Sequence, residues 1–131
     1  MKLLLDTHIW LWGLLDPERL TPAVRRALQA HENELWLSPI SVWEAVILVE
    51  RGRLTVKRPV AEWVEDMVQA LPRREAPLTH EIAVASRQLK LSHQDPADRF
   101  LAATAKVMEL TLVTADDRLL RTREYAVLAN R

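Results

Sequence analysis

Two aspartates lie three residues apart around a proline in the segment HQDPADRFLAATAKV, residues 93–107. Pro96 suits the first turn of a helix, so Asp95 is placed to cap the helix that follows. Asp98 lies inside that first turn, where the positive end of the helix gives an anion only a small stabilisation. Capping therefore explains Asp95, whereas the position of Asp98 favours a second interpretation, in which its carboxylate binds a metal ion.

Two further aspartates follow predicted strands. Asp6 comes directly after the apolar residues 2–5, and Asp116 comes shortly after the β-branched residues 111–114. In open parallel sheets, ligands bind in the crevice outside the carboxyl ends of the strands. An aspartate after a strand can equally be the cap of the next helix, so each residue taken alone fits either role.

Glu44 lies on or beside the buried stripe of a predicted amphipathic helix. Burying a lone carboxylate there is costly unless a positive group compensates it. The alternative is a residue at the border of the helix whose carboxylate reaches solvent or pairs with an arginine. The apolar positions around it are Ile40, Val42, Trp43, Val46, Ile47 and Val49.

Together, Asp6, Glu44, Asp98 and Asp116 form a set of four carboxylates from four separate elements. If they converge without a cation, they repel and raise one another's pKa. Hard oxygen ligands of this kind suit Mg²⁺ or Mn²⁺, which retain water and leave room for phosphate oxygens. Such a centre can activate a water and stabilise the leaving oxygen when a phosphodiester is hydrolysed. The set therefore predicts a metal-dependent site for phosphodiester hydrolysis.

The elements that must position these acids alternate between strands and helices. Short apolar or β-branched runs predict strands at residues 2–5, 34–38, 74–78, 111–114 and 125–129. Caps, prolines and helical spacing predict helices at residues 7–15, 21–33, 39–52, 59–71, 79–91, 96–110 and 116–121. This alternation predicts one domain over residues 1–131, a three-layer α/β/α sandwich with a central, mostly parallel sheet.

The composition excludes several classes of function. The chain of 131 residues has 18 basic and 18 acidic side chains, so a broad electrostatic footprint for nucleic acid is absent. It has no cysteine, which removes disulfides and thiolate metal sites and fits a cytoplasmic protein. Two glycines cannot build a P-loop or a dinucleotide-binding turn. The first apolar run is too short for a signal peptide, and no stretch approaches a membrane span.

Four segments carry a resemblance to a known family. In order along the chain they read LLLDTHIWLW, SPISVWEAVILVERGRL, HQDPADRFLAATA and LVTADDRLL. Their order and spacing resemble the PIN-domain ribonucleases, most closely the VapC-like toxins of type II toxin–antitoxin systems. The resemblance covers essentially the whole chain. It implies a Mg²⁺- or Mn²⁺-dependent endoribonuclease with the α/β/α fold of that family, which cleaves RNA when freed from its antitoxin and leaves a 5′-phosphate and a 3′-hydroxyl.

The resemblance also implies roles for individual residues. Asp6, Glu44, Asp98 and Asp116 match the four acids of the family, as catalytic residues and metal ligands. Thr7, Ser41 and Thr114 are expected to orient carboxylates or waters. Asp95 beside Asp98, and Asp117 beside Asp116, stay open as alternatives. His93 is expected to pack or hydrogen-bond near its helix, and His8 is not expected to be a ligand, because histidine suits zinc better than magnesium.

Several arginines are candidates for binding RNA. Arg99 and Arg118 lie next to or near two of the acids and could contact substrate phosphates, although Arg99 could instead hold Asp95 or Asp98. A denser basic run could form a local RNA rim or simply a solvated face. It comprises Arg51, Arg53, Lys57 and Arg58, with a smaller pair at Arg73 and Arg74.

The tryptophans and apolar helices point to partners. Trp36, Trp43 and Trp63 are expected in the core or in an interface rather than as platforms for bases. The helix at residues 7–15 is so apolar that part of it is expected to face a partner. The resemblance implies a homodimer and a small antitoxin in a hydrophobic groove. A nuclease of this family without an antitoxin, and a binding module whose acids only cap helices, are the alternatives.

Overall fold

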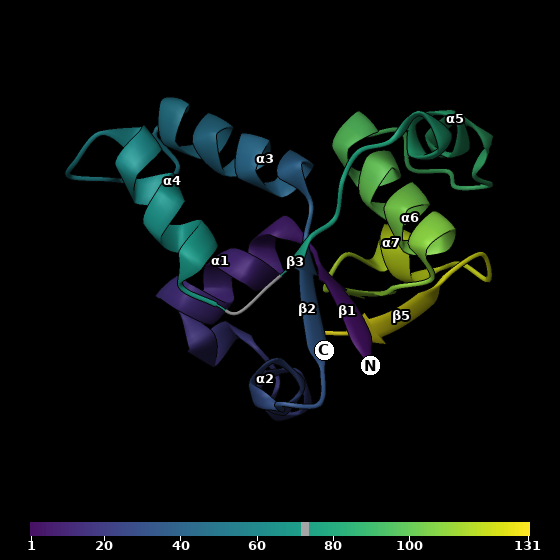
Figure 1. Cartoon of the computed structure of the whole chain (residues 1–131), viewed down its shortest axis with the longest axis horizontal. Coiled ribbons are helices and arrows are strands. Elements are labelled where there is room, and N and C mark those ends of the chain that lie inside the picture. Colours follow the sequence, from purple (N-terminus) through teal and green to yellow (C-terminus); the bar gives the residue numbers. More distant parts are fainter. Residues whose placement is uncertain (72–73) are drawn as a thin grey trace.

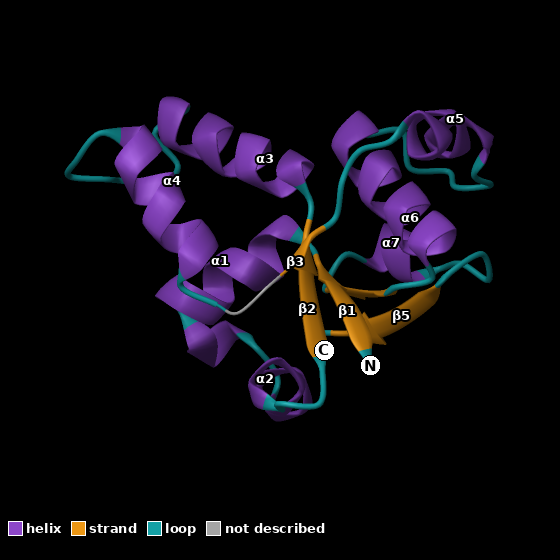
Figure 2. Ribbon diagram, viewed as in Figure 1, coloured by secondary structure: helices purple, strands orange, loops and turns teal. Residues whose placement is uncertain are grey.

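The computed structural model describes residues 1–71 and 74–131. Pro72, expected to bound a helix, and Arg73, one member of the smaller basic pair, lie outside these described residues. In the described part of the chain, strands and helices alternate as the sequence predicts (Figure 2). No helix in that part is long and apolar enough to cross a membrane.

A five-stranded sheet forms the centre of the described fold, with the strand order β3-β2-β1-β4-β5. Every neighbouring pair of strands is parallel. All carboxyl ends therefore meet at one edge of the sheet, and β1 and β4 lie side by side. The fold class predicted from the sequence is confirmed. The strands are β1 (Lys2–Leu5), β2 (Glu34–Leu37), β3 (Arg74–Glu75), β4 (Thr111–Thr114) and β5 (Ala126–Ala129).

Helices cover both faces of this sheet (Figure 1). Alternate side chains of β1 point to opposite faces, as the pleat of a strand requires. Leu3 and Leu5 pack with residues of α1, α2, α3 and α4, whereas Leu4 packs with residues of α5, α6 and α7. The helices are α1 (Thr7–Leu15), α2 (Pro22–Gln29), α3 (Pro39–Glu50), α4 (Val60–Gln69), α5 (His80–Gln88), α6 (Pro96–Met108) and α7 (Asp117–Leu120), with a 3₁₀ turn at Pro17–Arg19.

The elements that carry the acids begin at capping side chains. Asp6 caps α1, Ser38 caps α3, Asp95 caps α6 and Asp116 caps α7, each by accepting hydrogen bonds from backbone amides of the first turn. Pro39 and Pro96 stand in the first turns of their helices, where no backbone amide is needed. The same local chemistry that starts these helices therefore sets the positions of the acids.

Several predicted boundaries are shifted; for example, the helix expected at residues 21–33 ends at Gln29, and the one expected at 79–91 ends at Gln88. The strand expected at residues 74–78 is shorter because β3 pairs with β2 only through Arg74 and Glu75, and Pro77 cannot donate to a ladder. The helix expected to end at Gly52 ends at Glu50. Helix α6 ends at Met108, because Glu109 takes a left-handed conformation with φ of 55°.

The tryptophans are not all packed alike. Trp10 is fully buried and donates to the backbone carbonyl of Met67 at 3.3 Å. Trp43 is 56% exposed, and so does not belong to the core. The expectation of core packing is therefore wrong for Trp43, whose exposed surface is free to contact a partner or a ligand.

Candidate active site

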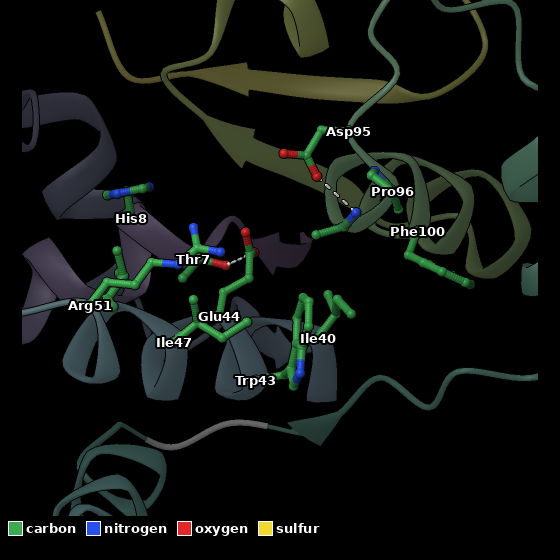
Figure 3. A pocket seen from close by; sticks show the side chains of 12 residues that line it. Thr7, His8, Ile40, Trp43, Glu44, Ile47, Arg51, Asp95, Pro96 and Phe100 are labelled. Carbon is green, nitrogen blue, oxygen red and sulfur yellow. Dashed lines mark hydrogen bonds between the residues drawn. The ribbon is translucent and has the colours of Figure 1, made fainter. Parts of the chain in front are cut away.

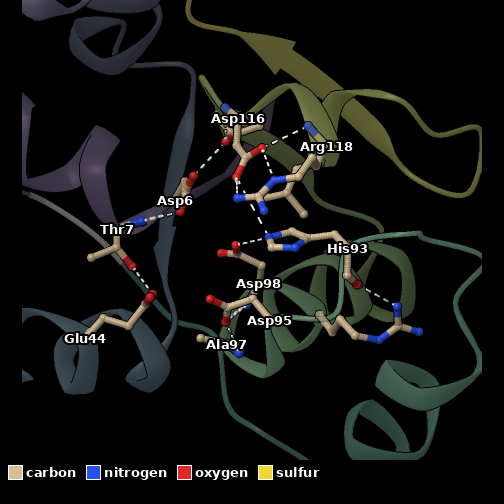
Figure 4. Close-up of polar contacts among 12 residues, drawn as sticks. Asp6, Thr7, Glu44, His93, Asp95, Ala97, Asp98, Asp116 and Arg118 are labelled. Atoms are coloured by element: carbon tan, nitrogen blue, oxygen red, sulfur yellow. Dashed lines mark hydrogen bonds and ion pairs between the residues drawn. The ribbon is translucent and has the colours of Figure 1, made fainter.

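One pocket at the carboxyl edge of the sheet brings together the four predicted acids. Asp6, Glu44, Asp98 and Asp116 all line this pocket, whose volume is about 490 Å³. They come from four separate elements and face a common space (Figure 4). Asp95 lines the same pocket. We call it the acidic pocket.

Asp6 is the most enclosed of these acids, with 8% of its surface exposed. One carboxylate oxygen accepts a hydrogen bond from the Thr7 amide at 2.7 Å, and the other accepts one from the Thr114 hydroxyl at 2.6 Å. Burial raises the pKa of Asp6, although both hydrogen bonds oppose that shift. The start of α1 and the end of β4 therefore hold the Asp6 side chain at a buried position, where an ionised carboxylate is destabilising.

Glu44 reaches the pocket from α3 and is held from α1. The Thr7 hydroxyl donates to its Oε1 at 2.6 Å and lies 2.9 Å from the hydroxyl of Ser41, one helical turn before Glu44. Burial, followed by repulsion from Asp98 and other acids, raises the pKa of Glu44 to about 7, against the Thr7 hydrogen bond. Thr7 contacts Glu44 as well as the neighbouring Asp6, and Ser41 contacts Thr7; their role in orienting carboxylates stays a prediction.

Asp95 and Asp98 have different environments. Asp95 accepts from the amides of Ala97 at 2.9 Å and Asp98 at 3.4 Å, so it is the cap of α6. Asp98 instead points into the pocket, where its carboxylate is hydrogen-bonded to Nε2 of His93. Burial raises the pKa of Asp98 to about 6, and the bond from His93 opposes that rise. Capping accounts for Asp95 but not for Asp98.

Asp116 is the most accessible of the four acids. Partial burial raises its pKa, but hydrogen bonds and charge from Arg118 outweigh burial and hold that pKa below its usual value. The Arg118 guanidinium reaches both carboxylate oxygens, at 3.3 and 3.1 Å. Asp117 is exposed and paired with Arg131 instead. Its side chain is not among those that line the acidic pocket.

Arg99 does not lie where a residue that contacts the substrate would lie. Its side chain is buried, and its guanidinium donates to the backbone carbonyls of Ser86, Leu89, Leu91 and His93 at 2.8 to 3.1 Å. These contacts use the donors that a phosphate would need, so the prediction that Arg99 contacts the substrate is wrong. The side chain holds the segment between α5 and α6 instead.

The donor set fits a divalent cation. Ligand atoms of His93, Asp98 and Asp116 lie within 4.8 Å of one another. Nε2 of His93 is 3.9 Å from Oδ2 of Asp116, so one imidazole lies between two carboxylates. With Asp6 and Glu44 on the same pocket, hard oxygen donors predominate, as Mg²⁺ and Mn²⁺ prefer. The hydrogen bond of His93 to Asp98 agrees with the expectation that His93 hydrogen-bonds near the start of its helix. Its place between Asp98 and Asp116 was not predicted, because it depends on how the loop before α6 folds.

Three residues of the basic run lie at separate places on the surface and do not form one continuous rim. Arg51 lines a second pocket that adjoins the acidic one, and Arg53 lines another groove beside α1. Arg58 is paired with Asp66 at 2.6 Å. Contact of these residues with RNA stays a prediction.

An all-parallel sheet between two layers of helices defines an α/β/α sandwich, and the acidic pocket lies outside the carboxyl ends of its strands, where ligands bind in open parallel sheets. Residues 3–125 match the PIN domain, and the chain belongs to this family. It is 35% identical over 117 residues to Ribonuclease VapC22 of Mycobacterium tuberculosis, a match that covers 88% of each chain. The family resemblance inferred from the four sequence segments is confirmed.

Solved structures share the fold. VapBC2 from Rickettsia felis, bound to a DNA fragment from its promoter, superposes with a TM-score of 0.76 at 16% identity and covers 98% of both chains. DNA-bound VapBC from Salmonella typhimurium gives a TM-score of 0.68 at 18% identity and covers 100% of this chain and 99% of that one. At these identities the likeness shows the fold alone.

Proposed function

We propose that this protein is a divalent-metal-dependent endoribonuclease and the toxin component of a type II toxin–antitoxin system. The observation that carries the proposal is the convergence of Asp6, Glu44, Asp98 and Asp116 on one pocket at the carboxyl edge of the sheet. Three of these acids have raised pKa values, because burial leaves their charges uncompensated within the chain. The 35% identity to a ribonuclease supports RNA as the substrate.

The implied cofactor is Mg²⁺ or Mn²⁺, held by Asp6, Glu44, Asp98 and Asp116. The chemistry that such a cation supplies is polarisation of a phosphodiester and a lower pKa for a coordinated water. Hydrolysis by water joins the water oxygen to phosphorus and releases the 3′ oxygen, which gives a 5′-phosphate and a 3′-hydroxyl. The hydrolysed bond is internal to the RNA, as in an endonuclease.

The residues around the acids have positioning roles. Thr114 holds Asp6, and His93 fixes the rotamer of Asp98. Thr7 holds Glu44 and is itself hydrogen-bonded to Ser41. Hydrogen-bonded acids lose little freedom when a ligand binds, so the site is organised in advance. Arg118 is exposed beside Asp116 and is the side chain placed to contact a substrate phosphate.

A small antitoxin and a second copy of the chain are the proposed protein partners. The solved structures that share this fold include VapBC pairs and a toxin–antitoxin complex from Klebsiella pneumoniae. An antitoxin that fills a hydrophobic groove and obstructs the acidic pocket would keep the nuclease silent in the cytoplasm. A nearby reading frame for a small DNA-binding protein separates this proposal from a nuclease of the same family without an antitoxin.

Cleavage of RNA by the purified chain, free of any co-purified partner, tests the proposal. The chain offers a matched pair of neighbouring aspartates, because Asp116 lines the pocket and Asp117 does not. We expect cleavage with Mg²⁺ or Mn²⁺ that EDTA abolishes, a loss of at least about 100-fold in Asp116→Asn, and near wild-type activity in Asp117→Asn. Activity that is insensitive to EDTA, or equal in both variants, would contradict the proposal.

A further inference from the structure

A second pocket adjoins the acidic pocket and opens between α3 and α6. Its volume is about 400 Å³, enough for a nucleobase with part of its sugar. His8, Glu44 and Asp95 line both pockets, so the two are continuous. Figure 3 shows Glu44 turned toward Thr7 at the boundary, with the apolar side chains of α3 beyond it. This second pocket is called the side pocket below.

The walls of the side pocket are mainly apolar. Ile40, Trp43 and Ile47 form a row on α3, and Pro96 and Phe100 of α6 face them. Trp43 immediately precedes Glu44 on α3, so its indole lies close to an acid of the proposed metal site. More than half of the Trp43 surface is exposed, although its neighbours on the same row are partly covered. An exposed aromatic face beside a polar reaction site is a surface on which a flat ring can stack.

We propose that the side pocket is a nucleobase subsite, in which the base of the nucleotide next to the scissile phosphate stacks on Trp43. The inference rests on the proposed ribonuclease function. A phosphate at the acidic pocket places the adjoining base at the edge of a cavity that is continuous with it. Stacking on an aromatic side chain is the general way in which proteins bind unpaired bases, because every base has a π-face.

The charges along the side pocket agree with a nucleotide. Arg51 lies at the end of the α3 row away from Phe100 (Figure 3), where a further phosphate of the strand would meet a cation. Thr7, Glu44 and Asp95 supply polar groups at the boundary with the acidic pocket. An apolar wall with a polar inner end and a cationic outer end matches a base flanked by two phosphates. In the purified chain, which is free of an antitoxin, a second copy of the chain is the competing occupant, and the oligomeric state of a Trp43 variant identifies it.

The test combines substitutions at Trp43 with RNAs that each lack one base. A short single-stranded RNA is made in versions that carry an abasic residue at one position at a time around the cleavage site. Binding is measured with Ca²⁺ in place of Mg²⁺, and a gel verifies that the RNA stays intact during the measurement. The value of kcat/KM is then measured with Mg²⁺. The proteins are wild type, Trp43→Ala, Trp43→Phe and Val84→Ala, the last as a control at an exposed apolar residue of α5.

The expected result is a coupling between Trp43 and one base, meaning that the effect of substituting Trp43 depends on whether that base is present. Trp43→Ala weakens binding and lowers kcat/KM by roughly 5- to 150-fold on intact RNA, and by much less on the RNA that is abasic beside the cleaved bond. Trp43→Phe retains most of the effect because a ring remains, and Val84→Ala changes nothing. Damage to folding or to Glu44 would instead reduce activity on every RNA equally.

Other outcomes separate this inference from the function on which it rests. Cleavage with no coupling at any base overturns the subsite and leaves the nuclease intact. Coupling in binding without cleavage supports the subsite and contradicts the nuclease. If sedimentation shows that Trp43→Ala turns a dimer into a monomer, with equal losses on all RNAs, Trp43 contacts a second copy and the subsite is wrong.

Discussion

The carboxylate of Asp6, at the end of β1, accepts a hydrogen bond of 2.6 Å from the hydroxyl of Thr114, the last residue of β4. The two residues are 108 positions apart in the sequence and become neighbours because β1 and β4 pair in parallel. The same Thr114 hydroxyl accepts from the amide of Asp116 at 3.0 Å. One side chain therefore links two of the four acids.

Replacing Thr114 with valine tests this link. The substitution keeps the shape of the side chain but leaves a buried carboxylate oxygen without its donor, so the free energy of unfolding falls by about 1–3 kcal/mol. Urea denaturation in EDTA measures the change. Thr114→Ser retains the hydroxyl and is the matched control. Equal stability of Thr114→Val and wild type would show that the hydrogen bond contributes little.

Arg99 should be among the residues most important for stability. Its removal leaves up to four carbonyls without a donor, three between α5 and α6 and that of Ser86 in the last turn of α5, and an ammonium cannot reproduce the planar set of contacts. We expect Arg99→Lys to lower the free energy of unfolding by at least about 3 kcal/mol. Arg87→Lys, on the exposed side of α5, is the control and should change stability little. A loss below about 1 kcal/mol in Arg99→Lys contradicts this role.

These two residues illustrate what the sequence could and could not predict. The position of Asp6 was predictable, because an apolar strand followed by an acid places that acid at the carboxyl edge of a parallel sheet. Arg99 was not, because its position beside Asp98 suggested the site, whereas its partners are carbonyls of a loop whose path no local pattern specifies. The same loop brings His93 to Asp98. The exposure of Trp43 depends on how α3 packs, and helical periodicity alone predicted a covered residue.

The metal-free protein should lose stability as the pH rises toward neutrality. Glu44, with its pKa raised from 4.5 to about 7, and Asp98, raised from 3.8 to about 6, bind protons more tightly when folded than when unfolded. Between roughly pH 4 and 7 the folded chain therefore carries more bound protons, and the free energy of unfolding falls with rising pH. The lowered pKa of Asp116 acts in the opposite direction, but below pH 3.8, outside that window.

Thermal melting in EDTA at a series of pH values checks this dependence. The midpoint should decrease from pH 5 to pH 7.5 in wild type, and less steeply in Glu44→Gln, which removes one of the titrating groups. A saturating concentration of Mn²⁺ should reverse the trend, since the cation binds the deprotonated acids. A midpoint that rises through this window in EDTA would contradict the raised pKa values.

Arg118 should compete with a cation for Asp116. The Arg118 guanidinium contacts both oxygens of that carboxylate. Because the ion pair is exposed, breaking it to bind a cation costs little free energy. We expect Arg118→Gln to bind Mn²⁺ about 2- to 5-fold more tightly, measured by calorimetry. Arg131→Gln, which frees the neighbouring Asp117 instead, is the control and should leave the affinity unchanged. Weaker binding in Arg118→Gln would mean that the arginine helps to orient Asp116 for the ion.

The most direct measurement is the thermal melting of wild type and Asp98→Asn, first in EDTA and then with millimolar Mn²⁺. If the acids form a metal site, wild type gains several degrees with Mn²⁺, because a ligand of the native state stabilises it. Asp98→Asn, relieved of one repelling charge, is then more stable than wild type in EDTA and gains little from Mn²⁺. If Mn²⁺ moves neither midpoint and Asp98→Asn only loses stability, the carboxylates are structural and the account of a metal-dependent nuclease is contradicted.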